Sequence, residues 1–242
     1  MRSIPGLHDY GRSSYWHYLS RTRRGNGNDA SASAAASSLA LCLPGEVMRG
    51  HIAWSAEVEG VLRPASFKHI LVYRDPRDVV VSLYYWWSKQ ERRTYLPYRH
   101  FASLLSEHDK IAFLIEGTKG MDSSPSGVVN YPDVGTRFRE FAGWFVDASC
   151  LKVRFEDLVS PSTRRTVCET VVRNLFPEAD TGFEELSLRR MIDGMSPSGS
   201  KTFRKGTSGE WREVFSAEHK EMFKKCAGDT LVSLGYEKDL AW

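Results

Sequence analysis

Two apolar runs, joined by Arg-Asp-Pro-Arg-Asp, dominate the sequence from residue 67 to residue 87, FKHILVYRDPRDVVVSLYYWW. The first run, residues 67–73, is short and rich in β-branched side chains, which predicts a buried strand. Asp75 and Pro76 are typical of a helix start, because aspartate accepts backbone N–H groups and proline suits the first helical position. The sequence therefore predicts a strand that leads directly into a helix.

A second strand followed by a helix is predicted further along the chain. Residues 150–158, CLKVRFEDL, have the pattern of a strand, and Ser160 with Pro161 predicts the start of the next helix. Strands that alternate with helices favour an α/β fold with a parallel sheet, in which ligands bind beyond the carboxyl ends of the strands. The other predicted helices cover residues 101–117, 136–147, 184–195 and 217–234.

The composition is that of an ordinary globular protein, with 242 residues, 41% hydrophobic and 26% charged. A net charge of +3 argues against nucleic acid as the main partner. No apolar run approaches the roughly 18 residues of a membrane span. The four cysteines lack C-x-x-C spacing, which argues against a zinc site and a disulfide framework. We therefore expect a cytoplasmic protein with no bound metal and no membrane partner.

The N-terminal part of the chain gives the weakest pattern. Residues 25–38, GNGNDASASAAASS, are small and low in complexity, which is typical of a flexible loop. We expect residues 1–45 to be a poorly defined segment and residues 46–242 to form the main domain.

Arg74 and Ser82 are candidate ligands for an anion at the predicted junction between strand and helix. The arginine offers a fork of donors that matches a phosphate, and Ser82 lies about two helical turns further on, where its hydroxyl can face the same anion. The alternative is that residues 74–78 form a surface ion network and Ser82 is a tolerated small core residue. On this stretch alone, the two interpretations are equally supported.

A second candidate for anion binding is the stretch FRKGTSGEW, residues 203–211. Its two adjacent cations and two glycines can wrap around an anion, because glycine permits close approach of the backbone. The alternative is a solvated basic turn. Together with Arg74 and Ser82, this stretch indicates a phosphorylated ligand.

The two stretches together resemble the sulfotransferases that use 3′-phosphoadenosine 5′-phosphosulfate (PAPS). The 3′-phosphate motif of that family has an arginine, then Asp/Asn-Pro-x-Asp, and a serine eight residues after the arginine, as in residues 74–82. Its late signature, Arg-Lys-Gly-x-x-Gly-Asp-Trp-Lys, is similar to RKGTSGEWR, with Glu210 and Arg212 as replacements of like charge. The cofactor-binding residues that the resemblance implies are Arg74, Ser82, Phe203, Arg204, Lys205 and Gly206.

The resemblance also implies a catalytic pair in MRGHIAW. His51 takes the place of the family's catalytic histidine, and Arg49 stands where the family has lysine. A neutral imidazole can remove the proton of an acceptor hydroxyl as that oxygen attacks sulfur. Arg49 would stabilise charge on the transferred group. The alternative for His51 is a polar residue at a strand edge.

Two further stretches are similar to the family. VRFEDL, residues 153–158, resembles the family's Tyr-Glu-Asp-Leu strand end, with Phe155 in place of tyrosine; the alternative is an acidic loop end that caps a helix. The closing LGYEKDLAW resembles the family's C-terminal end. The resemblance covers roughly residues 46–242. It implies a P-loop-NTPase-like parallel sheet flanked by helices.

One family element is not recognisable, namely the loop Pro-Lys-Ser-Gly-Thr-Thr-Trp that holds the 5′-phosphosulfate. The nearest string is YGRSSYW, residues 10–16, and Pro5 and Gly6 break any apolar strand before it. We expect the first strand and the phosphate loop to be missing or degenerate, because the chain starts late from a truncated or miscalled reading frame. The alternatives are a working but degenerate loop at residues 10–16 and a catalytically inactive relative.

The predicted function is transfer of a sulfuryl group from PAPS to a hydroxyl or amine acceptor. The acceptor would be a small molecule or a glycan-type hydroxyl, and residues 84–101 and 116–127 are candidates for its pocket. One alternative is a non-catalytic protein that binds 3′-phosphoadenosine. Another is a different phosphoryl-handling enzyme, which the sequence favours least because it has no G-x-x-x-x-G-K-[ST] motif.

Overall fold

The computed structural model describes nine stretches of the chain, which belong to two compact units that we describe separately. Each unit is built from two segments that are distant in sequence. The described residues are 8–9, 36–37, 39–42, 46–47, 50–64, 67–89, 96–118, 131–195 and 204–242. The first unit comprises Met1–Tyr73 and Phe141–Phe203, and the second comprises Arg74–Glu140 and Arg204–Trp242.

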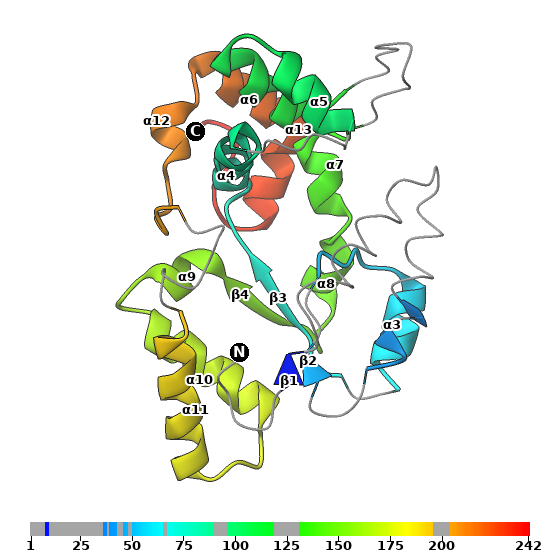
Figure 1. Ribbon diagram of the computed structural model, residues 1–242, viewed down its shortest axis with the longest axis vertical. Helices are drawn as coiled ribbons and strands as arrows, with labels where there is room; N and C mark the ends of the chain where they lie inside the picture. The colour runs from blue at the N-terminus through cyan, green and yellow to red at the C-terminus, as the bar shows by residue number, and fades with distance from the viewer. Residues whose placement is uncertain are drawn as a thin grey trace. The chain divides into compact units, whose positions relative to one another are not determined.

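A parallel pair of strands lies in the first unit. Strand β3 (Ile70–Tyr73) runs beside β4 (Leu151–Arg154), with Val72 opposite Val153 (Figure 1). The two strands and the parallel sheet that the sequence predicted are confirmed, although β3 begins at residue 70 and not at residue 67.

A second parallel pair joins β1 (His8–Asp9) to β2 (Glu46–Val47), and each of these strands has only two residues. The sequence predicted that the first strand is missing or degenerate, and β1, which ends directly before residues 10–16, is such a shortened strand. Pro5 and Gly6 precede β1, so they do not interrupt its pairing with β2. Residues 10–16 themselves lie outside the described part of the chain.

The predicted boundary after β4 is wrong. A short helix, α9 (Phe155–Val159), begins where the sequence predicted that the strand continues to residue 158. Ser160 ends this helix by donating its backbone N–H to Glu156, so it does not begin the next one. Helix α10 (Arg164–Leu175) therefore starts later than Ser160 and Pro161 predicted.

The helices of the first unit pack into two apolar clusters. Helix α10 lies beside α11 (Thr181–Asp193), and both contribute to a cluster that includes Val153 of β4 (Figure 1). The other cluster holds α3 (Ala56–Leu62) against Trp144 of α8 (Ala142–Val146). The buried members of the two clusters are Val153, Cys168, Val171, Val172, Leu188 and Met191, and Ala36, Leu39, Val58, Leu62, Trp144 and Cys150.

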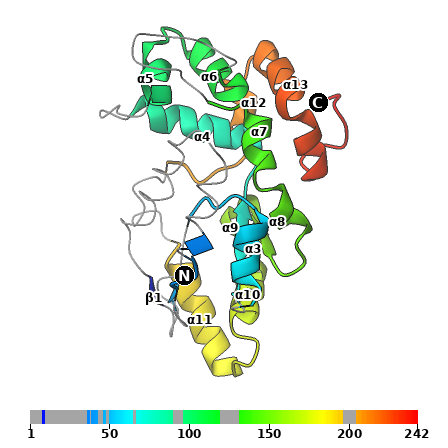
Figure 2. The same ribbon diagram turned by 90° about the vertical axis from the view of Figure 1, so that its right-hand side faces the viewer.

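The second unit is helical in its described part. Helix α13 runs beside α6 and α7, and a close approach is possible because Gly135 has no side chain (Figures 1 and 2). A Cβ atom at Gly135 would lie 1.9 Å from the carbonyl oxygen of Cys226. The helices are α4 (Pro76–Ser88), α5 (Leu96–Ser103), α6 (Glu107–Glu116), α7 (Val134–Arg139), α12 (Trp211–Val214) and α13 (Ala217–Ser233).

Two helices predicted as continuous are each divided in the structure. Ser106 begins α6 by accepting the N–H of Asp109, so the helix predicted over residues 101–117 is broken before it. The helix predicted over residues 136–147 is divided between α7 and α8, which belong to different units. Within the described ranges, no helix combines the length and the apolar character needed to cross a bilayer.

Candidate functional site

Helix α4 begins with a buried network of charges. The Asp75 carboxylate accepts the backbone N–H of Arg77 at 2.9 Å, which confirms the predicted cap. Asp75, Arg77 and Asp78 are 6%, 1% and 1% exposed. The ion network that the sequence offered as an alternative does form, but it is buried and not at the surface.

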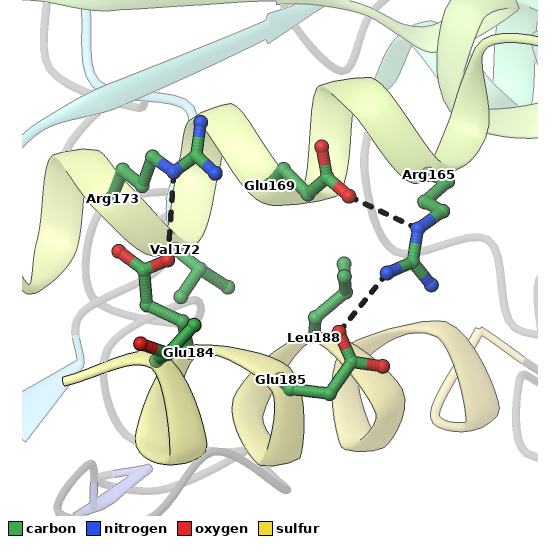
Figure 3. Close-up of a pocket in the computed structure, with 8 residues that line it drawn as sticks. Arg165, Glu169, Val172, Arg173, Glu184, Glu185 and Leu188 are labelled. Carbon is green, nitrogen blue, oxygen red and sulfur yellow. Dashed lines mark hydrogen bonds and ion pairs between the residues drawn. The ribbon is translucent and has the colours of Figure 1, made fainter. Parts of the chain in front are cut away.

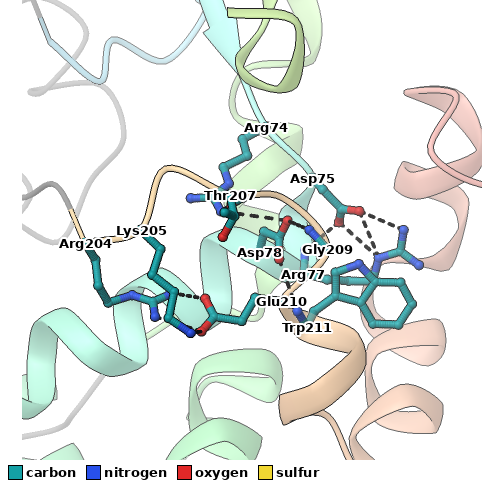
Figure 4. Close-up of polar contacts among 10 residues, drawn as sticks. All are labelled: Arg74, Asp75, Arg77, Asp78, Arg204, Lys205, Thr207, Gly209, Glu210 and Trp211. Atoms are coloured by element: carbon teal, nitrogen blue, oxygen red, sulfur yellow. Dashed lines mark hydrogen bonds and ion pairs between the residues drawn. The ribbon is translucent and has the colours of Figure 1, made fainter. Parts of the chain in front are cut away.

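The glycine-containing loop, residues 204–210, is attached to this helix through Asp78 (Figure 4). The Asp78 carboxylate accepts the backbone N–H groups of Gly209, at 2.6 Å, and of Trp211, at 3.2 Å. Gly206 and Gly209 have φ values of 65° and 86°, which L-residues with side chains rarely adopt. Glycine at these two positions therefore lets the loop curve back onto α4.

Arg74 links the same two segments from the other side of Asp78. Its Nη2 donates to the carbonyl oxygen of Thr207 at 2.9 Å and lies 3.7 Å from the Asp78 carboxylate (Figure 4). The arginine that precedes α4 and the glycine-containing loop are thus in direct contact, as both parts of one anion site would be.

Arg204 and Lys205 converge on a single carboxylate. Arg204 forms a two-pronged ion pair with Glu210, and the Lys205 ammonium lies 2.9 Å from the same side chain. The Arg204 guanidinium also lies over the ring of Tyr85 on α4, 4.2 Å from its centroid. Glu210 is 8% exposed, so it orients two cations from a buried position.

Ser82 lies on the face of α4 that the loop crosses. It follows Asp78 by four residues and precedes Tyr85 by three, and residues with these spacings share one face of a helix. The loop contacts Asp78 at one end and Tyr85 at the other. Ser82 itself is partly buried.

Five of the residues predicted from the sequence belong to the second unit, on α4, directly before it, or in the glycine-containing loop. The described residues do not include Arg49 or Phe203, whose predicted roles stay predictions. His51 belongs to the first unit. The five are Arg74, Ser82, Arg204, Lys205 and Gly206.

Two carboxylates that organise this site were not predicted from the sequence. Asp78 holds the loop backbone, and Glu210 orients Arg204 and Lys205. Helical spacing was a usable signal for Asp78, because it lies four residues after Arg74. For Glu210 the signal was its place within the second motif.

His51 is exposed, and the segment that follows it is fixed by helix α8. The indole N–H of Trp144 donates to the carbonyl oxygen of Ile52 at 2.9 Å. The ring of Trp54 lies against Gly143, where an added Cβ atom would be 2.2 Å from the indole. Both contacts come from adjacent residues of α8, so this helix determines the path of the chain after His51.

A His–Asp pair supports Trp144. The Asp147 carboxylate lies 3.1 Å from Nε2 of His69, and the His69 ring contacts the Trp144 ring edge-on with centroids 5.3 Å apart. The hydroxyl and the backbone N–H of Ser149 both donate to Asp147, and these hydrogen bonds lower its pKa to about 2. His69 adds a smaller effect in the same direction. The carboxylate is therefore charged at neutral pH and orients the imidazole.

Two other features of the described residues concern metal binding and a crevice. They contain no group of three or more His, Cys, Asp or Glu side chains placed to hold a metal ion. A crevice of about 180 Å³ between α10 and α11 is lined by charges that are already matched, as Arg165 pairs with Glu169 and Glu185, and Arg173 with Glu184 (Figure 3).

Comparison with known proteins identifies the family. The model of the sulfotransferase domain family matches residues 45–235. The chain belongs to the sulfotransferase family. A curated relative of this sulfotransferase-family chain is mouse sulfotransferase 2A6, which is 26% identical over 182 residues. That alignment covers 68% of this chain and 56% of the relative, so the chain spans little more than half the length of the relative.

A solved structure confirms the predicted fold class. The chain is similar to the crystal structure of mouse sulfotransferase SULT7A1 complexed with PAP, with a TM-score of 0.54 and 12% sequence identity. The similarity covers 94% of this chain and 82% of the other. This sulfotransferase-family chain therefore has the P-loop-like α/β fold of the family, with a small parallel sheet and many helices.

Proposed function

We propose that this chain binds the 3′-phosphate of PAPS and transfers the sulfuryl group of PAPS to a hydroxyl or amine acceptor. The observation that carries the proposal is the contact between Arg74 and Thr207, which joins the two motifs that together would surround a phosphate. Membership of the sulfotransferase family supports the same substrate class.

The residues at this site suit a phosphate dianion. Arg74, Arg204 and Lys205 supply three cationic groups around one face of α4, and guanidinium groups match phosphate oxygens with paired donors. Gly206 permits close approach of the loop backbone. Ser82 would add a hydroxyl donor. Phe203, the residue before the loop, is proposed to pack against the nucleotide.

His51 is proposed as the base of the transfer reaction. Its neutral imidazole would remove the acceptor proton while the acceptor oxygen or nitrogen forms a bond to sulfur. The bond between sulfur and the bridging oxygen would break, and its electron pair would remain on the 5′-phosphate of adenosine 3′,5′-bisphosphate. Arg49 would stabilise the negative charge on the transferred group.

Ligand-induced stabilisation tests the binding site. Adenosine 3′,5′-bisphosphate should raise the melting temperature of the full chain, because a ligand that binds only the folded state stabilises it. Arg74→Ala should abolish the rise. Arg189→Ala, which removes an equal charge from an exposed position on α11, should leave it unchanged. A wild-type chain with no rise would overturn the phosphate site.

A transfer assay separates the enzyme from a non-catalytic binding protein. Sulfate transfer from labelled PAPS to a panel of phenols, alcohols and amines should be detectable with the wild-type chain. His51→Ala should reduce it by roughly 10²- to 10⁴-fold, the contribution of a general base. Binding without any transfer would favour the non-catalytic alternative, and transfer that His51→Ala leaves unchanged would contradict the role of this base.

A further inference from the structure

Arg77 is a buried arginine at the start of α4, only 1% exposed, and two carboxylates neutralise it. Its Nε and Nη2 donate to the two oxygens of Asp75, at 3.0 Å and 2.8 Å. Its Nη1 donates to Glu237, which lies beyond the end of α13. Arg77 thus links the helix cap to residues 236–242, which we call the C-terminal segment.

Two indole rings pack against the same guanidinium. The Cζ atom of Arg77 lies 3.8 Å from the ring centroid of Trp211 and 4.5 Å from that of Trp242. The two rings are themselves in edge contact, with centroids 5.4 Å apart. Both indole N–H groups are buried and have no hydrogen-bond partner among the described residues. Packing and the cation therefore hold these rings.

Trp211 is also the residue at which the glycine-containing loop ends and α12 begins. Its backbone N–H donates to Asp78, and its ring contacts Arg77. Two consecutive residues of α4 therefore hold the backbone and the side chain of Trp211, the residue that directly follows the loop (Figure 4). The position of Trp211 constrains the preceding residues, which include Arg204 and Lys205.

We propose that Arg77 is a positioning residue for the phosphate site and that Glu237 and Trp242 determine 3′-phosphate affinity through it. This inference rests on the proposed function. Asp75 continues to pair with Nε and Nη2 of Arg77 when the Glu237 charge is removed, but the buried Nη1 loses its charged acceptor, and hydrogen bonds to charged groups are the stronger ones. Without the ring of Trp242, Arg77 loses its contact on one side. In either case the glycine-containing loop is held less firmly in the free protein. The nucleotide must then order the loop when it binds, and the cost of that ordering lowers the affinity.

The matched ligands adenosine 3′,5′-bisphosphate and adenosine 5′-phosphate test this inference, because they differ only in the 3′-phosphate. Calorimetric titration of the full chain gives the dissociation constant of each nucleotide. The measured quantity is the dissociation constant of adenosine 5′-phosphate divided by that of adenosine 3′,5′-bisphosphate. In Glu237→Gln and Trp242→Leu we expect this ratio to fall by roughly fivefold or more, the usual lower range of coupling between separate sites. Trp242→Phe keeps a ring over Arg77 and should retain the wild-type ratio.

Two controls define the limits of the measurement. Asp239→Asn makes the same chemical change as Glu237→Gln at an exposed position of the C-terminal segment, and should leave the ratio unchanged. Arg74→Ala gives the ratio expected when the phosphate contact is lost. Urea unfolding of each variant gives its free energy of unfolding, which shows whether a change in the ratio accompanies a loss of stability.

The possible outcomes separate the inference from the proposed function. A wild-type chain that binds the two nucleotides equally would overturn the proposed function itself. If the wild-type chain discriminates between them, and Glu237→Gln and Trp242→Leu discriminate equally well despite lower stability, the positioning role is wrong. A reduced ratio that Trp242→Phe restores would support it.

Discussion

The carboxylate of Asp78 accepts the backbone N–H of Gly209 at 2.6 Å, across 131 residues of sequence. The same carboxylate accepts the N–H of Trp211 and lies 3.7 Å from Nη2 of Arg74. One buried side chain therefore fixes the end of the glycine-containing loop and lies beside a cation of the proposed phosphate site. This arrangement makes the geometry of the site depend on a residue that need not touch the ligand.

Asp78→Asn should destabilise the second unit and weaken nucleotide binding. The variant replaces a charged acceptor of two N–H groups by an amide, and hydrogen bonds to charged groups contribute about 1.5–3 kcal/mol each. We expect a loss of that order in the free energy of unfolding, measured with urea. The affinity for adenosine 3′,5′-bisphosphate, measured by titration, should fall as well.

An exposed aspartate provides the control for Asp78→Asn. Asp229→Asn makes the same change on α13, where the side chain is exposed, and should alter neither stability nor affinity beyond experimental error. Equal effects of the two variants would show that net charge, and not the attachment of the loop, is responsible.

Local signals were sufficient to predict how α4 begins. Asp75 and Pro76 combine an acceptor with a residue suited to the first turn, and the structure has that cap. The apolar runs of β3 and β4 were sufficient to predict two strands of a parallel sheet, but not that these strands are neighbours. Helix ends were predicted less well, because residues such as Ser106 and Ser160 are compatible with more than one boundary.

Burial of the charged residues could not be predicted from the local sequence. Arg77 lies in a stretch that is compatible with a solvated ion network, and its burial depends on Trp211, Trp242 and Glu237, which are distant in sequence. Such contacts follow from tertiary packing, which periodicity and spacing do not encode. The contact of Arg74 with the glycine-containing loop was implied only by the family resemblance.

A matched pair of glycine substitutions tests how α8 holds the segment after His51. Gly143→Ala places a methyl group 2.2 Å from the Trp54 indole, so ring or helix must move. We expect the free energy of unfolding to fall by about 1–3 kcal/mol, the usual cost of overpacking. Urea unfolding measures this loss.

Gly60→Ala is the control for Gly143→Ala, because a Cβ atom at this position in α3 meets no atom within 4 Å. Alanine is favoured over glycine within a helix, so this variant should gain about 0.5–1 kcal/mol. If Gly143→Ala stabilises the chain as Gly60→Ala does, Trp54 is not packed against α8.

His219 should make the stability of the second unit depend on pH. Burial lowers its pKa below 6.5, and this effect exceeds the opposing effect of the hydrogen bond to the carbonyl oxygen of His108. Nδ1 of His219 accepts the N–H of Ser216 at 3.2 Å, and Nε2 lies 3.0 Å from that carbonyl oxygen. The neutral ring with its proton on Nε2 satisfies both bonds, whereas protonation of Nδ1 disrupts the start of α13.

The sign of the pH effect follows from the lowered pKa. Between the folded pKa and 6.5 the unfolded chain binds more protons, so the contribution of His219 is complete above pH 6.5 and is lost as the pH falls toward the folded value. Three other titratable groups face His219, namely the stacked ring of His108 and the carboxylates of Glu107 and Glu218. The dependence of wild-type stability on pH therefore cannot be assigned to His219 alone.

Comparison with His219→Gln isolates the contribution of this histidine. Glutamine retains a donor and an acceptor but does not titrate in this range. Urea midpoints measured from pH 7.5 to pH 5.5 should fall for the wild-type chain and change less for the variant, because only the wild type loses the neutral ring's contribution. Parallel curves for the two proteins would mean that His219 has the same pKa in the folded and unfolded states, against the burial seen at the start of α13.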